Sequence, residues 1–218
     1  MTGGAPGIAV TLARAWAPGR EPAARLISAA LVLCADHELN VSSFTARCAA
    51  SAGATPYAVV AAGLAALTGV KHGGHGERVE AFLREVGAQR GAGTRAAIAA
   101  RLKRGESLPG FGHELYPEGD PRCAELLQLA AEALPRSPAV ALGRVVAAHA
   151  FDLVGERPNL DFGLVIAARA LDLPPGGALA LFAIGRTIGW IGHAIEQYRL
   201  DRLIRPRARY IGEAPLGK

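Results

Sequence analysis

The sequence feature that most constrains the fold is a helical spacing of apolar residues that recurs along almost the whole chain. Leu26, Ala30 and Leu33 show it in one segment, where they share one helix face. Cap-forming residues precede such segments, and Gly or Pro follows them. No segment alternates apolar and polar residues as a half-buried strand would. The sequence therefore predicts an all-α protein with helices near residues 21–37, 41–53, 55–69, 78–87, 94–105, 120–134, 137–154, 163–171 and 178–200, after a loose leader over residues 1–20.

Composition limits the class of protein. The 218 residues are 50% hydrophobic, which is enough for one large domain or two small ones with real cores. The net charge of +5 suits either a solvated basic surface or an anionic ligand. A nucleic-acid partner is not expected, because the chain has no basic run with stacking aromatic residues. Three cysteines, an odd number without a signal peptide, favour reduced thiols and a cytoplasmic protein.

The most apolar run, residues 178–195, has to be compared with a membrane span. It contains Arg186 and His193, so we expect a buried helix and no membrane partner. The segment directly before it, Pro174–Gly177, consists of two prolines and two glycines. This segment is the best candidate for a hinge or a domain boundary.

One stretch concentrates the features of a binding site, residues 109–122 with the sequence Pro-Gly-Phe-Gly-His-Glu-Leu-Tyr-Pro-Glu-Gly-Asp-Pro-Arg. Glycines flank Phe111 and let the backbone come close to His113. The Asp-Pro step at Asp120 is a typical helix start, which puts Arg122 in the first turn. An imidazole, a guanidinium and free backbone N–H groups together suit a carboxylate or a phosphate. A loop that merely joins two helices is the alternative.

Three other residues need a choice between a structural and a chemical role. His37 lies at a helix junction, where a lone His is by default a satisfied structural group. Asp161 has apolar neighbours, which favour a raised pKa and proton transfer, but capping the next helix is the simpler explanation. Arg186 lies within an apolar helix, where burial is costly unless an anion such as a ligand carboxylate pairs with it.

A metal site has to be considered at His72 and His75, which are three residues apart in a Gly-rich segment. No third ligand has matching spacing, whereas zinc sites need three or four ligands. We therefore expect no metal. A His followed by two glycines also lets a backbone or a ligand approach closely.

Taken together, the motifs resemble those of the citrate synthase family. They are Ala35-Asp-His-Glu-Leu-Asn40, His72-Gly-Gly74, Gly110-Phe-Gly-His113, Asp120-Pro-Arg122, Pro158-Asn-Leu-Asp-Phe162, Gly185-Arg-Thr-Ile-Gly-Trp190 and Arg205-Pro206. Each is weak alone, but the set in this order, from about residue 26 to 212, is specific. The resemblance implies an all-α fold whose large and small domains close over the substrates. It implies a partial large domain, at residues 1–73 and 178–218, around a small domain at residues 74–177.

The resemblance also implies a reaction, the condensation of acetyl-CoA or a related acyl-CoA with oxaloacetate to give citrate and CoA. The catalytic residues would be Asp161, which removes a proton from the acetyl methyl, His72, which hydrogen-bonds the thioester carbonyl, and His113, which polarises the ketone. The oxaloacetate-binding residues would be His37, Arg122, Arg186 and, from the other subunit of a homodimer, Arg205. The CoA-binding residues would be Leu108, Gly110 and Gly112.

The sequence departs from the family pattern at several places, among them His75-Gly76, where Ala-Asn is usual, and Gly163, where Tyr is frequent. Large-domain helices that usually precede the residue matching Leu26 are missing, so a partner chain could supply them. Glu114 and Pro117 stand near a position where the family usually has a basic contact to CoA. A citryl-CoA lyase, which runs the cleavage with the same residues, and a non-catalytic ligand-binding homologue therefore stay open as alternatives. None of these functions calls for a cofactor besides the acyl-CoA substrate.

Overall fold

The computed structural model describes residues 6–69, 72–88, 92–209 and 211–212. Within these ranges the chain forms ten α-helices and no strand, with one antiparallel bridge between Phe111 and Pro158. The predicted all-α class is confirmed. The helices are α1 (Ile8–Trp16), α2 (Ala23–Cys34), α3 (Val41–Ser51), α4 (Pro56–Leu67), α5 (His75–Gly87), α6 (Ala92–Lys103), α7 (Pro121–Ala133), α8 (Pro138–Val154), α9 (Leu160–Ala170) and α10 (Gly177–Leu200).

Local sequence explains most of the helix starts. Asn40, Thr55 and Asp120 cap α3, α4 and α7, because each side chain accepts a backbone N–H of the first turn. A proline opens α4, α7 and α8, where its missing N–H would have had no partner in the helix. Gly155 ends α8 in the left-handed conformation. The helices predicted at these places are confirmed to within two residues at either end.

Several predictions about local structure are wrong. The helix α5 begins at His75 rather than at residue 78, and α2 ends at Cys34 rather than near residue 37. Residues 1–20 are more than a loose leader, because α1 forms within them and packs against α2. The next error concerns α9, which begins at Leu160 rather than near residue 163. Its N-cap is Asn159, whose side chain accepts the backbone N–H of Asp161 at 3.1 Å. Asp161 is therefore not the cap but lies in the first turn of α9.

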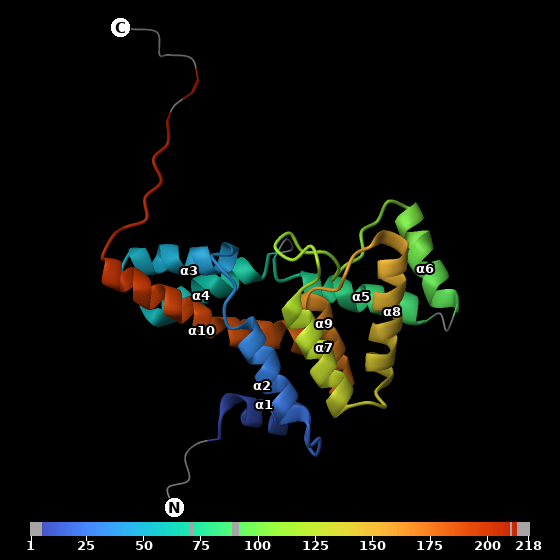
Figure 1. Cartoon of the computed structure of the whole chain (residues 1–218). Coiled ribbons are helices and arrows are strands. Elements are labelled where there is room, and N and C mark those ends of the chain that lie inside the picture. The colour runs from blue at the N-terminus through green and yellow to red at the C-terminus, as the bar shows by residue number, and fades with distance from the viewer. Residues whose placement is uncertain (1–5, 70–71, 89–91, 210, 213–218) are drawn as a thin grey trace, which may run out of the picture.

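Two groups of buried apolar side chains hold the helices together. The larger group runs from α1 and α2 through α7 and α9 to α5 and α8. The smaller one lies between α3, α4 and α10. In Figure 1 these three helices extend to one side, while α5, α7 and α8 pack around α9 on the other. The division at residues 73 and 177 stays a prediction, and the larger group of buried side chains crosses it.

The longest helix, α10, carries the two largest fully buried side chains, Trp190 and Arg186. Its length and apolar composition alone would allow it to cross a membrane. It packs against α2, α3, α4 and α9 on one face, while Ile188 and Ile195 are exposed on the other, so it is a half-buried helix rather than the buried one predicted.

Two glycines of α10 let α2 and the segment after it approach very closely. A Cβ atom on Gly185 would lie 2.6 Å from a backbone carbonyl oxygen of α2. A Cβ atom on Gly189 would overlap the carbonyl oxygen of Ala35. Because the opposing atoms belong to the backbone, no side chain can move aside. The segment that carries His37 therefore lies directly against the helix that carries Arg186.

Gly189→Ala should destabilise the fold by roughly 1–3 kcal/mol, the usual cost of overpacking a tight contact. Urea unfolding measures the change. Gly192 is the matched control on the same helix, because a Cβ atom there would meet nothing within 4 Å. Gly192→Ala should be neutral or slightly stabilising, since Ala favours helix over Gly. Equal stability of the two variants would contradict the close approach.

Candidate active site

The Gly-rich loop between α6 and α7 brings His113 to the N-terminus of α9. Gly110 and Gly112 have φ angles of 84° and 74°, which glycine adopts without strain. The backbone N–H of Asn159 donates to the Gly110 carbonyl at 2.8 Å, and Asn159 Nδ2 donates to the Gly112 carbonyl at 3.0 Å. Phe111 is buried between Phe82 and Phe162. The loop and the start of α9 thus form one packed unit.

The ring of His113 has a defined tautomer. The backbone N–H of Leu115 donates to His113 Nδ1 at 3.1 Å. In the neutral ring the proton therefore lies on Nε2. An N–H donor of this kind suits a carbonyl oxygen that gains negative charge during a reaction.

The guanidinium of Arg122 is fixed by Asp120. Its Nε and Nη2 donate to the two carboxylate oxygens at 2.9 and 2.8 Å. Burial acts to raise the pKa of Asp120, but the hydrogen bonds and charge of Arg122 outweigh it and hold the pKa below its ordinary value. Asp120 also accepts the backbone N–H of Leu160 at 3.0 Å, which ties the start of α7 to the start of α9. Arg122 Nη1 has no hydrogen-bond partner among the described residues.

Arg186 is a cation in the protein interior, with 1% of its surface exposed. Its Nε donates to the carbonyl oxygen of Cys34 at 2.7 Å, and its guanidinium lies over the ring of Phe182 at 4.9 Å. Its Nη1 is buried without a hydrogen-bond partner in the part of the chain that the structure describes. Burial lowers the pKa of Arg186. An unpaired buried cation is costly, which is evidence for an anionic ligand at this place.

His37 lies between these cations. Burial and the charges of Arg122, His113 and Arg186 lower the pKa of His37, so the ring is neutral near pH 7. Its Nε2 lies 2.9 Å from the hydroxyl oxygen of Tyr116. The rings of His37 and His113 meet edge to face, with centroids 5.4 Å apart. His37 is therefore part of the charged cluster as well as of a helix junction.

A polar network at the start of α3 holds His72. Its Nε2 lies 2.9 Å from the hydroxyl oxygen of Ser42. Trp190 Nε1 donates to the same oxygen at 3.2 Å, and that hydroxyl lies 2.9 Å from Asn40 Oδ1. Burial and then nearby positive charge lower the pKa of His72, so this imidazole is also neutral near pH 7.

Asp161 and His72 line the same small cavity, of about 20 Å³, which has room for roughly one water molecule. Burial raises the pKa of Asp161 against the opposing charges of His75 and Arg122. The Asp161 carboxylate accepts no hydrogen bond from the described residues. A carboxylate with a raised pKa that lines one cavity with a neutral imidazole is an arrangement suited to proton transfer.

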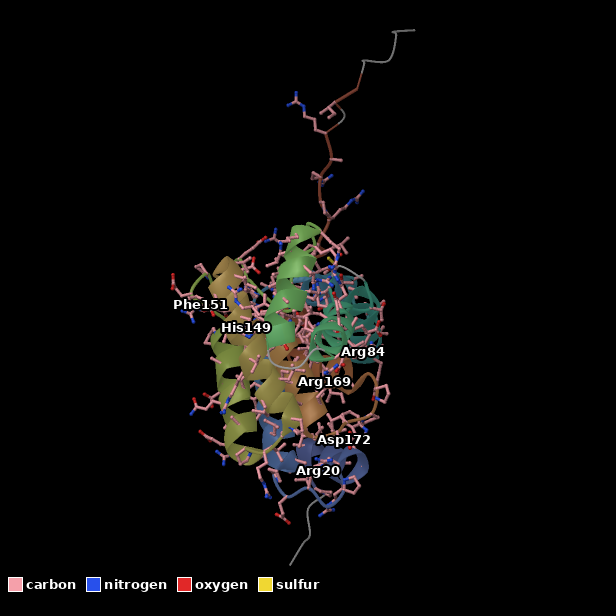
Figure 2. All side chains as sticks on the ribbon, turned by 90° about the vertical axis from the view of Figure 1, so that its right-hand side faces the viewer. Arg20, Arg84, His149, Phe151, Arg169 and Asp172 are labelled. Atoms are coloured by element: carbon pink, nitrogen blue, oxygen red, sulfur yellow. The ribbon has the colours of Figure 1, made fainter. Side chains whose placement is uncertain are left out.

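A larger cleft of about 1370 Å³ opens beside this cavity and shares wall residues with it at the starts of α5 and α10. It lies between α5, the α7–α8 connection and the segment before α10. Figure 2 shows Arg84, Arg169, Asp172 and Arg20 following one another down this face. Arg20 pairs with Asp172, and Arg169 pairs with Glu80. Much of the charge in the cleft wall is therefore already compensated.

The structure brings the predicted catalytic and carboxylate-binding residues of this chain into one cluster, with Arg205 excepted. The cluster consists of His37, His72, His113, Arg122, Asp161 and Arg186, linked by the contacts and charges above. Arg205 lies on the exposed segment after α10, which runs away from the helices (Figure 1). Leu108 is buried, and Gly110 and Gly112 pack against the start of α9. CoA binding at these three residues and the role of Arg205 stay predictions.

Sequence reasoning missed the residues that hold the cluster in shape. It assigned no role to Ser42 or Tyr116, and it assigned Asp120 only a helix cap. Tyr116 lies three residues after His113 within the stretch singled out above, and that position was the available signal. The contacts of Ser42 with His72 and Trp190, and of Asp120 with Leu160, join segments that are far apart in the sequence, so no local pattern indicates them.

Comparison with known proteins gives consistent matches. A family model described as "Citrate synthase, C-terminal domain" matches residues 6–207. The chain is 38% identical over 195 residues to "Putative citrate synthase 2" of Mycobacterium tuberculosis, covering 87% of this chain and 52% of that protein. The chain therefore spans about half the length of this curated relative.

Two solved structures are similar over nearly the whole chain. Citrate synthase from Thermoplasma acidophilum, solved with carboxymethyl coenzyme A and oxaloacetate, has a TM-score of 0.79 and 28% identity over 99% of this chain and 59% of that one. Citryl-CoA lyase from Hydrogenobacter thermophilus has a TM-score of 0.85 and 25% identity over 99% of this chain and 88% of that one.

Proposed function

Since the chain belongs to the citrate synthase family, we propose that it condenses acetyl-CoA, or a related acyl-CoA, with oxaloacetate to give citrate and CoA. The observation that carries the proposal is Arg186, whose buried Nη1 has no hydrogen-bond partner in the described part of the chain. A small dianion such as oxaloacetate supplies the missing negative charge. The oxaloacetate in the T. acidophilum relative supports this choice of ligand.

Two guanidinium groups are available for the two carboxylates of oxaloacetate. Arg122 offers its Nη1, and Arg186 offers its buried Nη1. Hydrogen bonds between ionised groups are about twice as strong as neutral ones. His113 would donate from Nε2 to the ketone oxygen between the carboxylates, and this bond strengthens as the oxygen gains charge.

Asp161 is the proposed base for the methyl group of acetyl-CoA. A thioester methyl is a weak carbon acid, so a base and a donor at the thioester oxygen have to act together. Asp161 and His72 line one cavity, which supports this pairing. The raised pKa of Asp161 makes its carboxylate a stronger base than in water. The methyl proton passes to the carboxylate, and the electron pair of the C–H bond forms the C=C bond of an enolate, whose oxygen accepts the hydrogen bond from His72.

The network at Ser42 decides which nitrogen of His72 can donate. Trp190 Nε1 is only a donor, so it occupies one lone pair of the Ser42 hydroxyl. Asn40 Oδ1 can only accept, so the hydroxyl hydrogen of Ser42 goes to Asn40. The neutral His72 ring then donates from Nε2 to Ser42, and it can donate from Nδ1 to the thioester oxygen only when the Ser42 hydroxyl turns toward Nε2 on substrate binding.

The carbon–carbon bond would form when the enol carbon attacks the ketone carbon of oxaloacetate. The ketone oxygen becomes a hydroxyl by taking the Nε2 proton of His113, which solvent replaces as Asp161 gives up the methyl proton, and the product is citryl-CoA. Water then hydrolyses the thioester to citrate and CoA. No electrons are transferred to an acceptor, so the proposed reaction needs no redox cofactor and consumes acetyl-CoA as a substrate.

Cleavage of citryl-CoA is the second candidate function. The chain covers 88% of the H. thermophilus lyase, with a TM-score of 0.85, compared with 59% of the T. acidophilum synthase. The same residues serve this direction from the opposite protonation states, because His113 without its Nε2 proton would accept the hydroxyl proton and protonated Asp161 would return a proton to the methyl carbon.

We further propose that the protein acts as a cytoplasmic homodimer. Val41 and Phe44 on α3, with Tyr57 and Leu64 on α4, are apolar side chains at the surface that a second copy would cover. Arg205 would then enter the partner's site. A separate chain that supplies further large-domain helices is the other arrangement, since the curated relative is about twice as long. The proposal includes no nucleic-acid or membrane partner.

A thiol-release assay tests the proposed function. Free CoA thiol should appear with acetyl-CoA and oxaloacetate together, and with neither substrate alone. Citryl-CoA as the substrate separates the two candidates, because a synthase gives citrate and free CoA, whereas a lyase gives acetyl-CoA and oxaloacetate without free thiol. If neither reaction occurs but oxaloacetate raises the melting temperature, the chain is a ligand-binding homologue without turnover.

A further inference from the structure

Tyr116 contacts three of the residues that we propose bind oxaloacetate. Its hydroxyl oxygen lies 2.9 Å from His37 Nε2. Its ring lies against that of His113, with centroids 4.9 Å apart. The guanidinium of Arg122 lies over the same ring, 5.4 Å from its centroid. One half-buried side chain thus touches an imidazole from another segment, an imidazole from its own loop and a guanidinium from α7.

The hydrogen bond to His37 joins two segments that are 79 residues apart in the sequence. His37 belongs to the connection between α2 and α3, and Tyr116 belongs to the loop before α7. In the described part of the chain, the Tyr116 hydroxyl is the one hydrogen-bond partner of the His37 side chain. Without that hydroxyl, the imidazole of His37 would lose the contact that fixes its rotation.

The ring of Tyr116 restricts Arg122 in a different way. Asp120 holds the Nε and Nη2 edge of the guanidinium, and Tyr116 covers one of its flat faces. The Nη1 end is the part that remains for a ligand. Because the edge and one face are both occupied, this end can point in few directions.

We propose that Tyr116 is a positioning residue for the dicarboxylate substrate, acting through His37, Arg122 and His113. The inference rests on the proposed function, since it takes oxaloacetate as the ligand. Tyr116 makes no hydrogen bond or ring contact with His72 or Asp161 in the described structure. Its loss should therefore weaken oxaloacetate binding and leave methyl deprotonation largely unchanged.

Tyr116→Phe is the direct test, because it removes the hydroxyl and keeps the ring. The KM for oxaloacetate should rise about tenfold, the scale of one lost hydrogen bond in a charged site. We expect kcat and the KM for acetyl-CoA to stay within about threefold of wild type. Tyr198→Phe is the matched control, because it also removes a hydroxyl hydrogen bond, the one to the Ala54 carbonyl. It should change none of these values, because in the described structure Tyr198 has no hydrogen bond or ring contact with His37, His113 or Arg122.

Two further variants separate the hydroxyl from the ring. Tyr116→Leu removes both, so it should raise the oxaloacetate KM beyond the Phe variant by freeing Arg122 and His113. In the His37→Asn background, Tyr116→Phe should add little, because the hydroxyl acts through an imidazole that is already gone. Additive effects of the two substitutions would show that the hydroxyl does not act through His37.

The outcomes distinguish this inference from the proposed function. Isothermal titration with oxaloacetate supplies the second readout, independent of turnover. If the wild type binds oxaloacetate and Tyr116→Phe binds it equally well, the role of Tyr116 is wrong and the proposed function stands. If Tyr116→Phe raises both KM values equally and lowers the melting temperature, its role is merely structural and the inference is again wrong. If the wild type binds no oxaloacetate, the proposed function fails, and the inference fails with it.

Discussion

Replacing Asp161 with Asn should lower turnover by at least ~10²-fold while oxaloacetate binding stays close to wild type. Asn keeps the size and polarity of Asp but cannot accept the methyl proton, and losing general-base catalysis typically costs this much. The side chains proposed to bind oxaloacetate are histidines and arginines, and the substitution leaves them in place. Steady-state thiol release and isothermal titration with oxaloacetate measure the two effects. Asp172→Asn, at an exposed carboxylate paired with Arg20, is the matched control and should turn over normally.

The pH dependence of the free energy of unfolding is an independent test of the raised pKa of Asp161. Its folded pKa is raised, so between the ordinary carboxyl pKa and that raised value the folded chain binds more protons than the unfolded chain. The free energy of unfolding should therefore fall as the pH rises through this window. Asp161→Asn removes this dependence, and the variant should be at least as stable as wild type at pH 7. Asn159 remains the cap of α9 in the variant. Wild-type turnover in Asp161→Asn would overturn the proposed mechanism.

Arg186→Met should weaken oxaloacetate binding by about 30-fold or more. Removing one partner of a buried charged pair costs roughly 2–5 kcal/mol of binding free energy, because the substrate carboxylate is left unpaired. Without ligand the variant should fold with nearly unchanged stability. The lost Nε bond to Cys34 is offset by removal of a buried cation whose Nη1 has no partner in the described structure. Titration and thermal unfolding, each with and without oxaloacetate, measure both effects.

Arg169→Met is the contrasting variant. Arg169 is partly buried, whereas Arg186 is fully buried, and the guanidinium of Arg169 already pairs with Glu80 at 2.7 Å. Its loss should lower stability and leave oxaloacetate affinity unchanged. If Arg186→Met behaved in the same way as Arg169→Met, Arg186 would be a structural cation, and the observation that carries the proposed function would be lost.

Local sequence predicts most of the helices, because caps and prolines act within one turn. Thr55-Pro56 and Asp120-Pro121 start α4 and α7 where expected. The predicted start of α9 is wrong for a local reason as well. Asn159 and Asp161 can each cap a helix, and their spacing in the sequence does not decide between them. Asn159 is the observed cap, and this leaves the Asp161 carboxylate facing the cavity.

The candidate site depends on long-range packing, which local patterns cannot supply. His37 and Tyr116 are 79 residues apart, and Trp190 and Ser42 are 148 apart, yet each pair shares a hydrogen bond. The resemblance to a family suggested which residues gather, but it said nothing of the groups that hold them. The three contacts of Tyr116 and the second role of Asp120 at α9 emerge only when the helices are packed.

The glycines of α10 have a consequence for substrate choice. The backbone contacts at Gly185 and Gly189 join Arg186 and His37 into one rigid block. Asp120 joins Arg122 to the start of α9, and so to Asp161, in a second block. The two blocks are packed against each other, α2 on α7 and α10 on α9, so this packing sets the spacing of the two arginines. We expect a dicarboxylate one methylene longer to bridge the arginines poorly, so that the pocket selects substrates by length and not only by charge.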